Sequence, residues 1–406
     1  MGHEPLEPQG GLAMSERMNV LSPEFRQNPY PYYAELRRTR PVCQVEPGGM
    51  WAVSRYEDVL FVLKHPEIFS QGFRDTWQPP WVGYNPLANS MMALDPPAHT
   101  RLRSLVNRAF GPQVIARIEP PLRRLAAELA EGLGPGKEVD FVESFAMPLP
   151  AFVIGELLGL DHSLRPRFKR WGDDITSITP EPKSPEDAAR VRKTIADLTS
   201  YLADVVAARR RSPEDDLVTD LVQAQVDGAG LSDKEIIELL VMLLLGGLET
   251  TMLFLGSTLL FWAQHPEWMA RLREVPALLP RFLEEMLRYD GPSHALPRLV
   301  TTEVTLSGVT IPKGALVLAL VASANHDERQ FPDPERFDPE RGSQGGLQFG
   351  HGIHFCIGAM LGRMEARVGL EALLARFRRV ERADGPVHYN RMLPVRGPIS
   401  LPLRFV

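Results

Sequence analysis

The most restrictive feature of this sequence is an apolar run over residues 232–264, whose central part reads IIELLVMLLLGGLETTMLFLGSTLLFWA. Ser232 and Glu235 have the spacing of a capping box, which predicts that a helix begins there. Pro266 predicts its end, because proline cannot continue the helical hydrogen-bond ladder. In a membrane, the Glu249 carboxylate would sit at the middle of the span and cost about 2.5–3.5 kcal/mol. We therefore predict a buried core helix that crosses the whole domain.

Small and polar residues interrupt this helix at its middle. Gly246 and Gly247 each cost about 1 kcal/mol relative to alanine in a helix interior, and Glu249, Thr250 and Thr251 stand where leucines would pack. One interpretation is functional: the glycines let a flat ligand approach the backbone, while Thr250 and Glu249 deliver protons. The other is a helix kink in which the threonines bond back to preceding carbonyl groups. On this segment alone, both interpretations stand.

The remaining sequence predicts a mainly α fold with a small β region, of the α+β class. Apolar residues recur at helical spacing over 31–39, 56–64, 98–110, 115–132, 144–159, 186–211, 266–273, 278–289 and 358–378. Short strand-like runs occur at 42–54, 297–311, 315–321 and 400–405. The stretch 325–348 has no period and predicts a long ordered coil. We expect a disordered tail over 1–16 and a single domain over 17–406, since no linker or repeat marks a boundary.

Composition excludes several classes of protein. The 45 Lys and Arg residues against 51 Asp and Glu residues give a net charge of −6, which argues against a basic nucleic-acid binder. A hydrophobic share of 44% and a charged share of 24% are ordinary for globular proteins and exclude a polytopic membrane protein. Two cysteines cannot form a disulfide framework, and no secretory leader opens the chain. We expect a soluble cytoplasmic protein.

The most informative segment is Phe349-Gly-His-Gly-Ile-His-Phe-Cys356-Ile-Gly358, which connects the long coil to a predicted helix. Cys356 should face free amide groups and the positive end of that helix, which lower a thiol pKa. The glycines remove side chains from the loop, as a large planar ligand would require. Three interpretations compete: a buried structural cysteine, a zinc site with His351 and His354, and an axial thiolate on haem iron.

These residues resemble the haem-binding signature of the cytochrome P-450 superfamily, specifically its soluble bacterial members. In that signature a Phe, two Gly, a basic residue, the ligand Cys and a following Gly have fixed spacing, and Phe349, Gly350, His354, Cys356 and Gly358 match it. The resemblance covers the chain from about residue 28 to its end. It implies the cytochrome P-450 fold, with the long helix over haem b and Cys356 as the metal ligand.

Further positions match the family in order along the chain. The segment Gly247-Leu-Glu249-Thr250-Thr resembles the oxygen-binding groove, with an acid and an alcohol as the catalytic pair. Haem propionates would contact His99, Arg103, Arg298 and His354. A structural network that braces the haem loop would contain Glu285 and Arg288 together with Arg336.

The implied activity is that of a haem-thiolate monooxygenase, which activates dioxygen to hydroxylate or epoxidise an apolar small molecule of lipid, terpenoid, steroid or polyketide type. Thiolate ligation favours cleavage of the O–O bond. Thr250 would hold a water or hydroperoxide and Glu249 would relay protons. Residues expected near the substrate are Phe73, Trp77, Trp81, Tyr84, Met91, Met92, Met242, Leu245, Gly246, His294 and Leu296.

The chain has no Rossmann fingerprint, and its two cysteines cannot hold an iron–sulfur cluster, so we expect neither a flavin nor such a cluster. Electrons would come from a ferredoxin or flavodoxin with its reductase, docking near Arg363 and Arg108. We expect a monomer that binds neither nucleic acid nor membrane. The alternatives are a peroxide-driven haem peroxygenase, which would be expected to lack the acid–alcohol pair, and a non-catalytic haem-thiolate sensor, which would need a signalling segment.

Overall fold

The structure, a computed structural model, describes residues 17–72, 78–179, 181–226, 229–342 and 345–406. The predicted tail over 1–16 lies outside the described residues. The α-helices are α1 (Pro23–Gln27), α2 (Tyr30–Thr39), α3 (Tyr56–Lys64), α5 (Ala98–Ala109), α6 (Pro112–Leu133), α7 (Pro148–Leu157), α8 (Arg165–Thr176), α9 (Pro185–Arg211), α10 (Leu217–Gln223), α11 (Asp233–Gln264), α12 (Glu267–Glu274), α13 (Leu279–Asp290), α14 (Val321–Ala324) and α15 (Ala359–Arg376). Short 3₁₀ turns are η1 (Leu87–Asn89), η2 (Met91–Ala93), η4 (His162–Leu164), η5 (Pro276–Leu278) and η6 (Gly352–His354), and η3 (Val142–Ala146) is a π-helix.

The strands are short and form one larger sheet with several small ones. They are β1 (Val42–Val45), β2 (Met50–Val53), β3 (Phe69–Ser70), β4 (Glu138–Asp140), β5 (Gln225–Val226), β6 (Ala229–Gly230), β7 (Leu296–Val300), β8 (Val304–Leu306), β9 (Val309–Ile311), β10 (Leu316–Ala319), β11 (Val380–Arg382), β12 (His388–Tyr389), β13 (Pro398–Ser400) and β14 (Pro402–Phe405). The larger sheet has the order β1-β2-β10-β7-β3, and β10 runs parallel to β2 but antiparallel to β7. A second sheet has the order β11-β14-β4.

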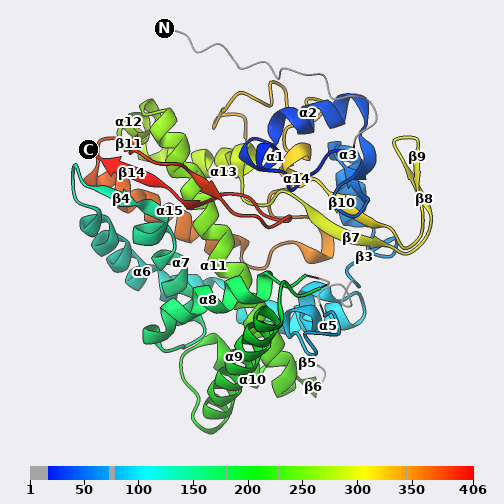
Figure 1. Cartoon of the computed structure of the whole chain (residues 1–406). Helices are drawn as coiled ribbons and strands as arrows, with labels where there is room; N and C mark the ends of the chain where they lie inside the picture. Colours follow the sequence, from blue (N-terminus) through cyan, green and yellow to red (C-terminus); the bar gives the residue numbers. More distant parts are fainter. Residues whose placement is uncertain (1–16, 73–77, 180, 227–228, 343–344) are drawn as a thin grey trace.

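Helix α11 passes through the middle of the molecule, between the larger sheet and the helices α8, α9 and α10 (Figure 1). Its start is the predicted capping box: Ser232 Oγ accepts from the Glu235 amide, and Glu235 Oε2 accepts from the Ser232 amide at 2.8 Å. By length and composition α11 could span a membrane, yet 72% of its most apolar window is buried inside the fold. It is a core helix, as the sequence predicts.

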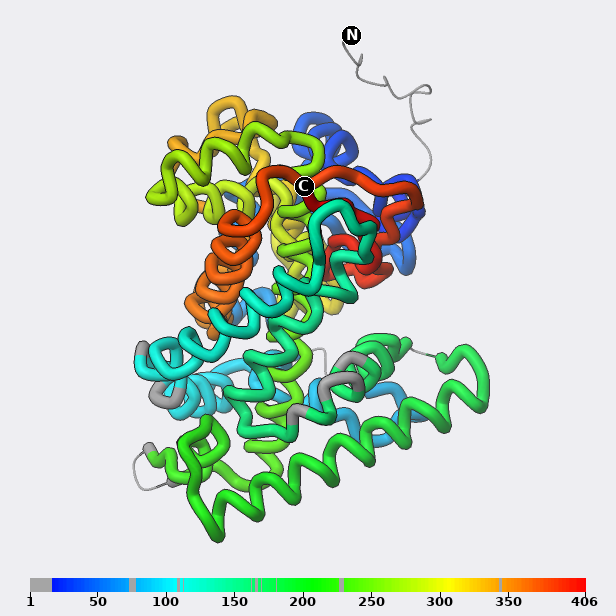
Figure 2. The backbone as a smooth tube through the Cα atoms, turned by 90° about the vertical axis from the view of Figure 1, so that its left-hand side faces the viewer, coloured from blue at the N-terminus to red at the C-terminus, as the bar shows by residue number. Residues whose placement is uncertain are grey.

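Two other segments approach α11 closely and define its middle. Helix α15 packs beside it where a Cβ on Gly362 would lie 3.8 Å from Thr251 Oγ1. The C-terminal segment crosses it where a Cβ on Gly397 would lie 2.7 Å from Leu253 Cβ. Figure 2 shows α15 and the C-terminal strands on the side of the molecule away from α9. The central helix is therefore flanked by the segment after Cys356 and by the last strands.

Candidate active site

The Cys356 loop is a tight turn between the long coil and α15. The Cys356 amide donates to the Phe349 carbonyl at 2.9 Å, which closes the loop. Gly350 and Gly352 have φ of +72° and +71°, a left-handed conformation that favours glycine. A Cβ on Gly352 would also lie 2.8 Å from the Leu63 carbonyl oxygen. These glycines are required by the turn itself, in addition to any ligand.

The thiol of Cys356 is free and keeps accessible surface, although protein groups surround it closely. Burial raises its pKa, whereas the Gly358 amide and the guanidinium groups of Arg103 and Arg363 lower it. Burial has the largest effect, so the predicted lowering of this pKa is wrong in direction for the chain alone. The sequence pattern identified the stabilising groups but not the desolvation that opposes them.

The middle of α11 presents one glycine to open space and the other to a neighbouring helix. A Cβ on Gly246 would meet nothing within 4 Å, whereas a Cβ on Gly247 would lie 2.4 Å from Ile154 Cδ1 of α7. The lack of a side chain at Gly247, which was assigned to the cofactor site, therefore also allows α7 to pack closely. The Thr250 hydroxyl donates to the Gly246 carbonyl at 2.9 Å, the back-bond of the structural interpretation, and its oxygen can still accept.

Sequence reasoning missed several residues that surround the predicted acid–alcohol pair. Asn390 Nδ2 donates to Glu249 Oε1 at 3.5 Å from the C-terminal segment. On the other side, buried Glu365 of α15 is hydrogen-bonded by the Thr251 side chain, and burial raises the pKa of Glu365 to about 8. The sequence analysis predicts the helix over 358–378 that contains Glu365 but gives no signal for this residue.

Buried basic groups lie near the cysteine loop. The rings of His99 and His354 are 4.2 Å apart, and both ring nitrogens of His99 and Nε2 of His354 have no hydrogen-bond partner among the described residues. Burial lowers the pKa of His354 to about 3 and that of Arg298 to about 10. Arg103 is near enough to affect the Cys356 thiol. Such unpaired buried donors fit the carboxylates of a haem, which need hydrogen-bonding partners.

The predicted bracing network forms, but with a different second arginine. Arg288 makes two bonds of 2.8 Å to Glu285, and both residues are buried. Arg341 Nε lies 3.5 Å from Glu285 Oε1 and Arg341 also donates to the Arg336 carbonyl at 3.0 Å. The Arg336 side chain is 71% exposed and, among the described residues, pairs with Asp338 at 3.7 Å. The prediction that the Arg336 side chain joins this network is therefore wrong. Its side chain points outward, and Arg336 contributes its backbone carbonyl, which accepts from Arg341.

The residues predicted to line the substrate pocket are dispersed around α11. Met91, Met242 and Leu245 are buried, Met92 and Leu296 are half-buried, and a Cβ on Gly172 of α8 would touch Leu245 at 3.4 Å. Phe73 and Trp77 lie outside the described residues.

Three polar groups in this region have partners of their own. Trp81 Nε1 donates to the Thr179 carbonyl at 3.0 Å, and Tyr84 donates to buried Glu238 at 2.7 Å. His294, expected near the substrate, is buried, and its Nδ1 lies 3.0 Å from the Tyr33 hydroxyl. The contacts of Trp81 and Tyr84 attach the loop before η1 to the segment after α8 and to α11.

Two further expectations concern the docking of a redox partner and a metal site. Arg363, expected near the docking surface, is paired with Glu284 through two contacts that neutralise part of its charge. The structure does not describe the side chain of Arg108, the other residue expected near the docking surface. For zinc, the described chain contains no group of three or more His, Cys, Asp or Glu residues that could hold a metal ion. His354 faces His99 instead.

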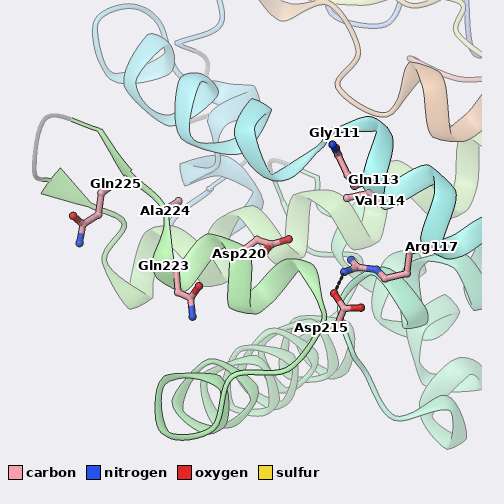
Figure 3. Close-up of a pocket in the computed structure, with 9 residues that line it drawn as sticks. All are labelled: Gly111, Gln113, Val114, Arg117, Asp215, Asp220, Gln223, Ala224 and Gln225. Atoms are coloured by element: carbon pink, nitrogen blue, oxygen red, sulfur yellow. Dashed lines mark hydrogen bonds and ion pairs between the residues drawn. The ribbon is translucent and has the colours of Figure 1, made fainter.

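A pocket of about 630 Å³ opens elsewhere, between the start of α6 and α10 (Figure 3). It is lined by Gly111, Gln113, Val114, Arg117, Asp215, Asp220, Gln223, Ala224 and Gln225. Its charged pair, Arg117 and Asp215, is joined at 2.5 Å. No residue of the cysteine loop or of the middle of α11 lines it, so the chemistry favours the region around Cys356 over this pocket.

Comparisons with known proteins agree with this geometry. The family model described as Cytochrome P450 matches residues 8–275 and 277–395. The chain is 36% identical over 402 residues to 6-deoxyerythronolide B hydroxylase of Saccharopolyspora erythraea, covering 95% of this chain and 98% of the relative. It is also 36% identical over 367 residues to vitamin D(3) 25-hydroxylase of Pseudonocardia autotrophica, covering 89% of each.

Solved structures match over nearly the whole chain. Cytochrome P450 CYP109Q5 from Chondromyces apiculatus has a TM-score of 0.87 and 39% identity, covering 96% of this chain and 98% of that one. CYP109E1 from Bacillus megaterium in complex with corticosterone has a TM-score of 0.83 and 33% identity, covering 94% and 99%. These similarities, over nearly the whole chain, establish that it belongs to the cytochrome P450 family and is a P450 monooxygenase.

Proposed function

We propose that this monooxygenase hydroxylates or epoxidises an apolar small molecule of polyketide or steroid type, at a haem b held by Cys356. The observation that carries the proposal is the position of α15, which follows the Cys356 loop directly and packs against α11 at Thr251. Gly362 follows Cys356 closely in sequence, so this contact supports a site shared by the cysteine loop and the acid–alcohol pair. Haem bound through a thiolate supplies dioxygen activation and transfer of one oxygen atom to a substrate carbon.

His99, Arg103, Arg298 and His354 would hold the haem carboxylates. Support comes from the unpartnered ring nitrogens of the two histidines and from the burial of Arg298, which is 4% exposed. A buried cation or donor of this kind is stabilised by an anionic partner, and two carboxylates on one rigid ligand would satisfy several of them. Phe349 and Gly350 shape the loop before the cysteine, and Gly358 supplies the amide that faces the thiol.

Thr250 and Glu249 would deliver protons. The Thr250 hydroxyl is anchored by donation to the Gly246 carbonyl, so its oxygen would accept a hydrogen bond from a water in the site. Glu249 is half-buried and can exchange protons between this site and solvent.

The test is the Thr250→Ala variant, measured as product formed per dioxygen consumed. We expect normal haem and substrate binding with reducing equivalents diverted to hydrogen peroxide. Unchanged coupling would remove Thr250 from the mechanism.

The substrate class rests on the relatives and on the apolar residues near α11. The names of the relatives specify 6-deoxyerythronolide B and vitamin D(3), and one related structure holds corticosterone. Met91, Met242, Leu245 and Leu296 offer apolar contact to molecules of this kind. Titration of these three compounds, followed by the ferric spin-state change, tests the class, and a response only to small polar compounds would contradict it.

The remaining features follow the same family pattern. We propose that residues 17–406 act as one domain, that the protein is a cytoplasmic monomer, and that a ferredoxin or flavodoxin with its reductase supplies electrons. Turnover with dioxygen and such a redox pair distinguishes this function from a peroxygenase, which would form product only with added peroxide. A protein that binds haem but turns over with neither would be a sensor.

A further inference from the structure

A buried polar chain links Glu249 to the N-terminal helix α1. Asn390, which follows β12, donates from Nδ2 to Glu249 Oε1 at 3.5 Å. Its Oδ1 accepts from the Arg26 guanidinium at 2.8 Å. Asn390 and Arg26 are 5% and 6% exposed, so both groups are shielded from solvent. These hydrogen bonds therefore connect the buried Arg26 guanidinium, through the Asn390 amide, to the proposed catalytic carboxylate of Glu249.

The amide orientation of Asn390 is fixed by its neighbours. Its Oδ1 accepts from Arg26 and from the Gly397 amide at 3.2 Å, so both donors face the oxygen. Its Nδ2 faces only acceptors in these contacts, Glu249 Oε1 and the Val395 carbonyl at 3.2 Å. A flipped amide would place like groups against each other on both sides. Asn390 therefore acts as a donor toward Glu249.

Arg26 is anchored independently of Glu249. It donates to the carbonyl groups of Asn390 and Val395 at 3.1 and 2.7 Å, and its own carbonyl accepts from Arg396 Nε at 2.7 Å. Arg396 is in turn paired with Asp290 at 3.1 Å. Burial lowers the pKa of Arg26 to about 10, so it remains charged at neutral pH. A fixed positive charge polarises the Asn390 amide and strengthens its donation to a carboxylate.

We propose that Asn390 and Arg26 are positioning residues that hold the Glu249 carboxylate in its proton-delivering orientation. The proposal rests on the proposed role of Glu249 in proton delivery. The new element is that residues near both ends of the polypeptide orient this acid: Arg26 of α1 and Asn390 of the C-terminal segment. These two residues are 364 positions apart in the sequence.

The decisive variant is Asn390→Asp, which is nearly isosteric. The aspartate keeps an oxygen for Arg26 and for the Gly397 amide, but it replaces the donor that faces Glu249 with an acceptor. Asn390→Ala removes the donor without adding charge and serves as a second variant if the first folds poorly. Ser400→Ala, which loses one bond of 2.6 Å to Asp140 in the same C-terminal segment, controls for general loosening.

Coupling is measured as product per dioxygen consumed, with a surrogate ferredoxin and reductase. The substrate probe is whichever of corticosterone, vitamin D(3) and 6-deoxyerythronolide B gives the largest ferric spin-state change. We expect about a tenfold loss of coupling in Asn390→Asp, the scale of one hydrogen bond to a charged group. The solvent deuterium isotope effect on product formation should rise in Asn390→Asp. Its haem content and thermal unfolding should equal those of Ser400→Ala.

Infrared spectroscopy supplies a readout that does not depend on turnover. The carboxylate stretching band of Glu249, assigned by its loss in Glu249→Gln, should shift in Asn390→Ala and stay unchanged in Ser400→Ala. If Glu249→Gln loses coupling while both Asn390 variants keep the wild-type coupling and band, the positioning role is overturned and the role of Glu249 stands. If Glu249→Gln keeps full coupling, both proposals fail.

Discussion

Glu365 of α15 provides a quantitative test of how this core is built. Its side chain is buried, 2% exposed, and burial raises its pKa from 4.5 to about 8. At pH values between 4.5 and about 8, Glu365 keeps its proton in the folded protein but loses it in the unfolded chain. The resulting stability is complete below pH 4.5 and is lost as the pH rises toward 8. From pH 4.5 to 7 the loss amounts to about 3 kcal/mol, at 1.36 kcal/mol per pH unit.

The Glu365→Gln variant removes this penalty, because an amide cannot ionise and its oxygen can still accept from Thr251. At pH 7 we expect a Tm increase on the order of 4 °C, given about 2.1 cal/mol/K of unfolding entropy per residue. At pH 5 the gain in unfolding free energy of Glu365→Gln over the wild type should fall below about 1 kcal/mol. Thermal unfolding followed by circular dichroism at both pH values measures the difference.

The control is Glu371→Gln on the same helix, where a half-exposed carboxylate pairs with Arg123 and Arg367. Removing such surface pairs should cost at most about 1 kcal/mol. If Glu365→Gln lowers the Tm at both pH values, or shifts it equally at both, the carboxyl is ionised in the folded protein and the reasoning is refuted.

Two further predictions compare neighbouring positions. Arg341→Met should destabilise the fold by about 2 kcal/mol, because it removes charged hydrogen bonds near buried Glu285. Arg336→Met should change the stability by less than about 0.5 kcal/mol. If denaturant titration gave equal losses for both variants, the Arg336 side chain would belong to the network after all. Gly247→Ala should cost about 1 kcal/mol through overpacking, and Gly246→Ala should raise stability by up to about 1 kcal/mol through helix propensity. The reverse order of Tm values would contradict the packing described here.

Much of the helical frame could be predicted from the sequence because its signals are local. The capping box at Ser232, the proline after α11 and the apolar periods place α3, α9 and α11 within a residue or two of their observed bounds. Helices α8 and α10 were missed, since α8 contains Pro166 and Gly172 and α10 is short. Two-residue strands such as β3 carry no period and form only through pairing with distant partners.

The site was predictable where a motif carried it and not where contacts join distant segments. The loop around Cys356 has fixed spacing, so its residues were found together. Nothing in the sequence relates Arg26 to Asn390, and outward rotation of one side chain replaced Arg336 by Arg341. The pKa of the Cys356 thiol was predicted in the wrong direction because desolvation depends on the packed surroundings rather than on neighbouring residues in sequence.

The central claim is that Cys356 is the haem thiolate ligand. The most direct measurement is the absorption spectrum of the reduced protein with carbon monoxide, compared between wild type, Cys356→Ser and Cys43→Ser. We predict a strongly red-shifted Soret band in wild type and Cys43→Ser, and its loss in Cys356→Ser. A red-shifted band that persists in Cys356→Ser, or a wild-type protein that takes up no haem, would contradict the account.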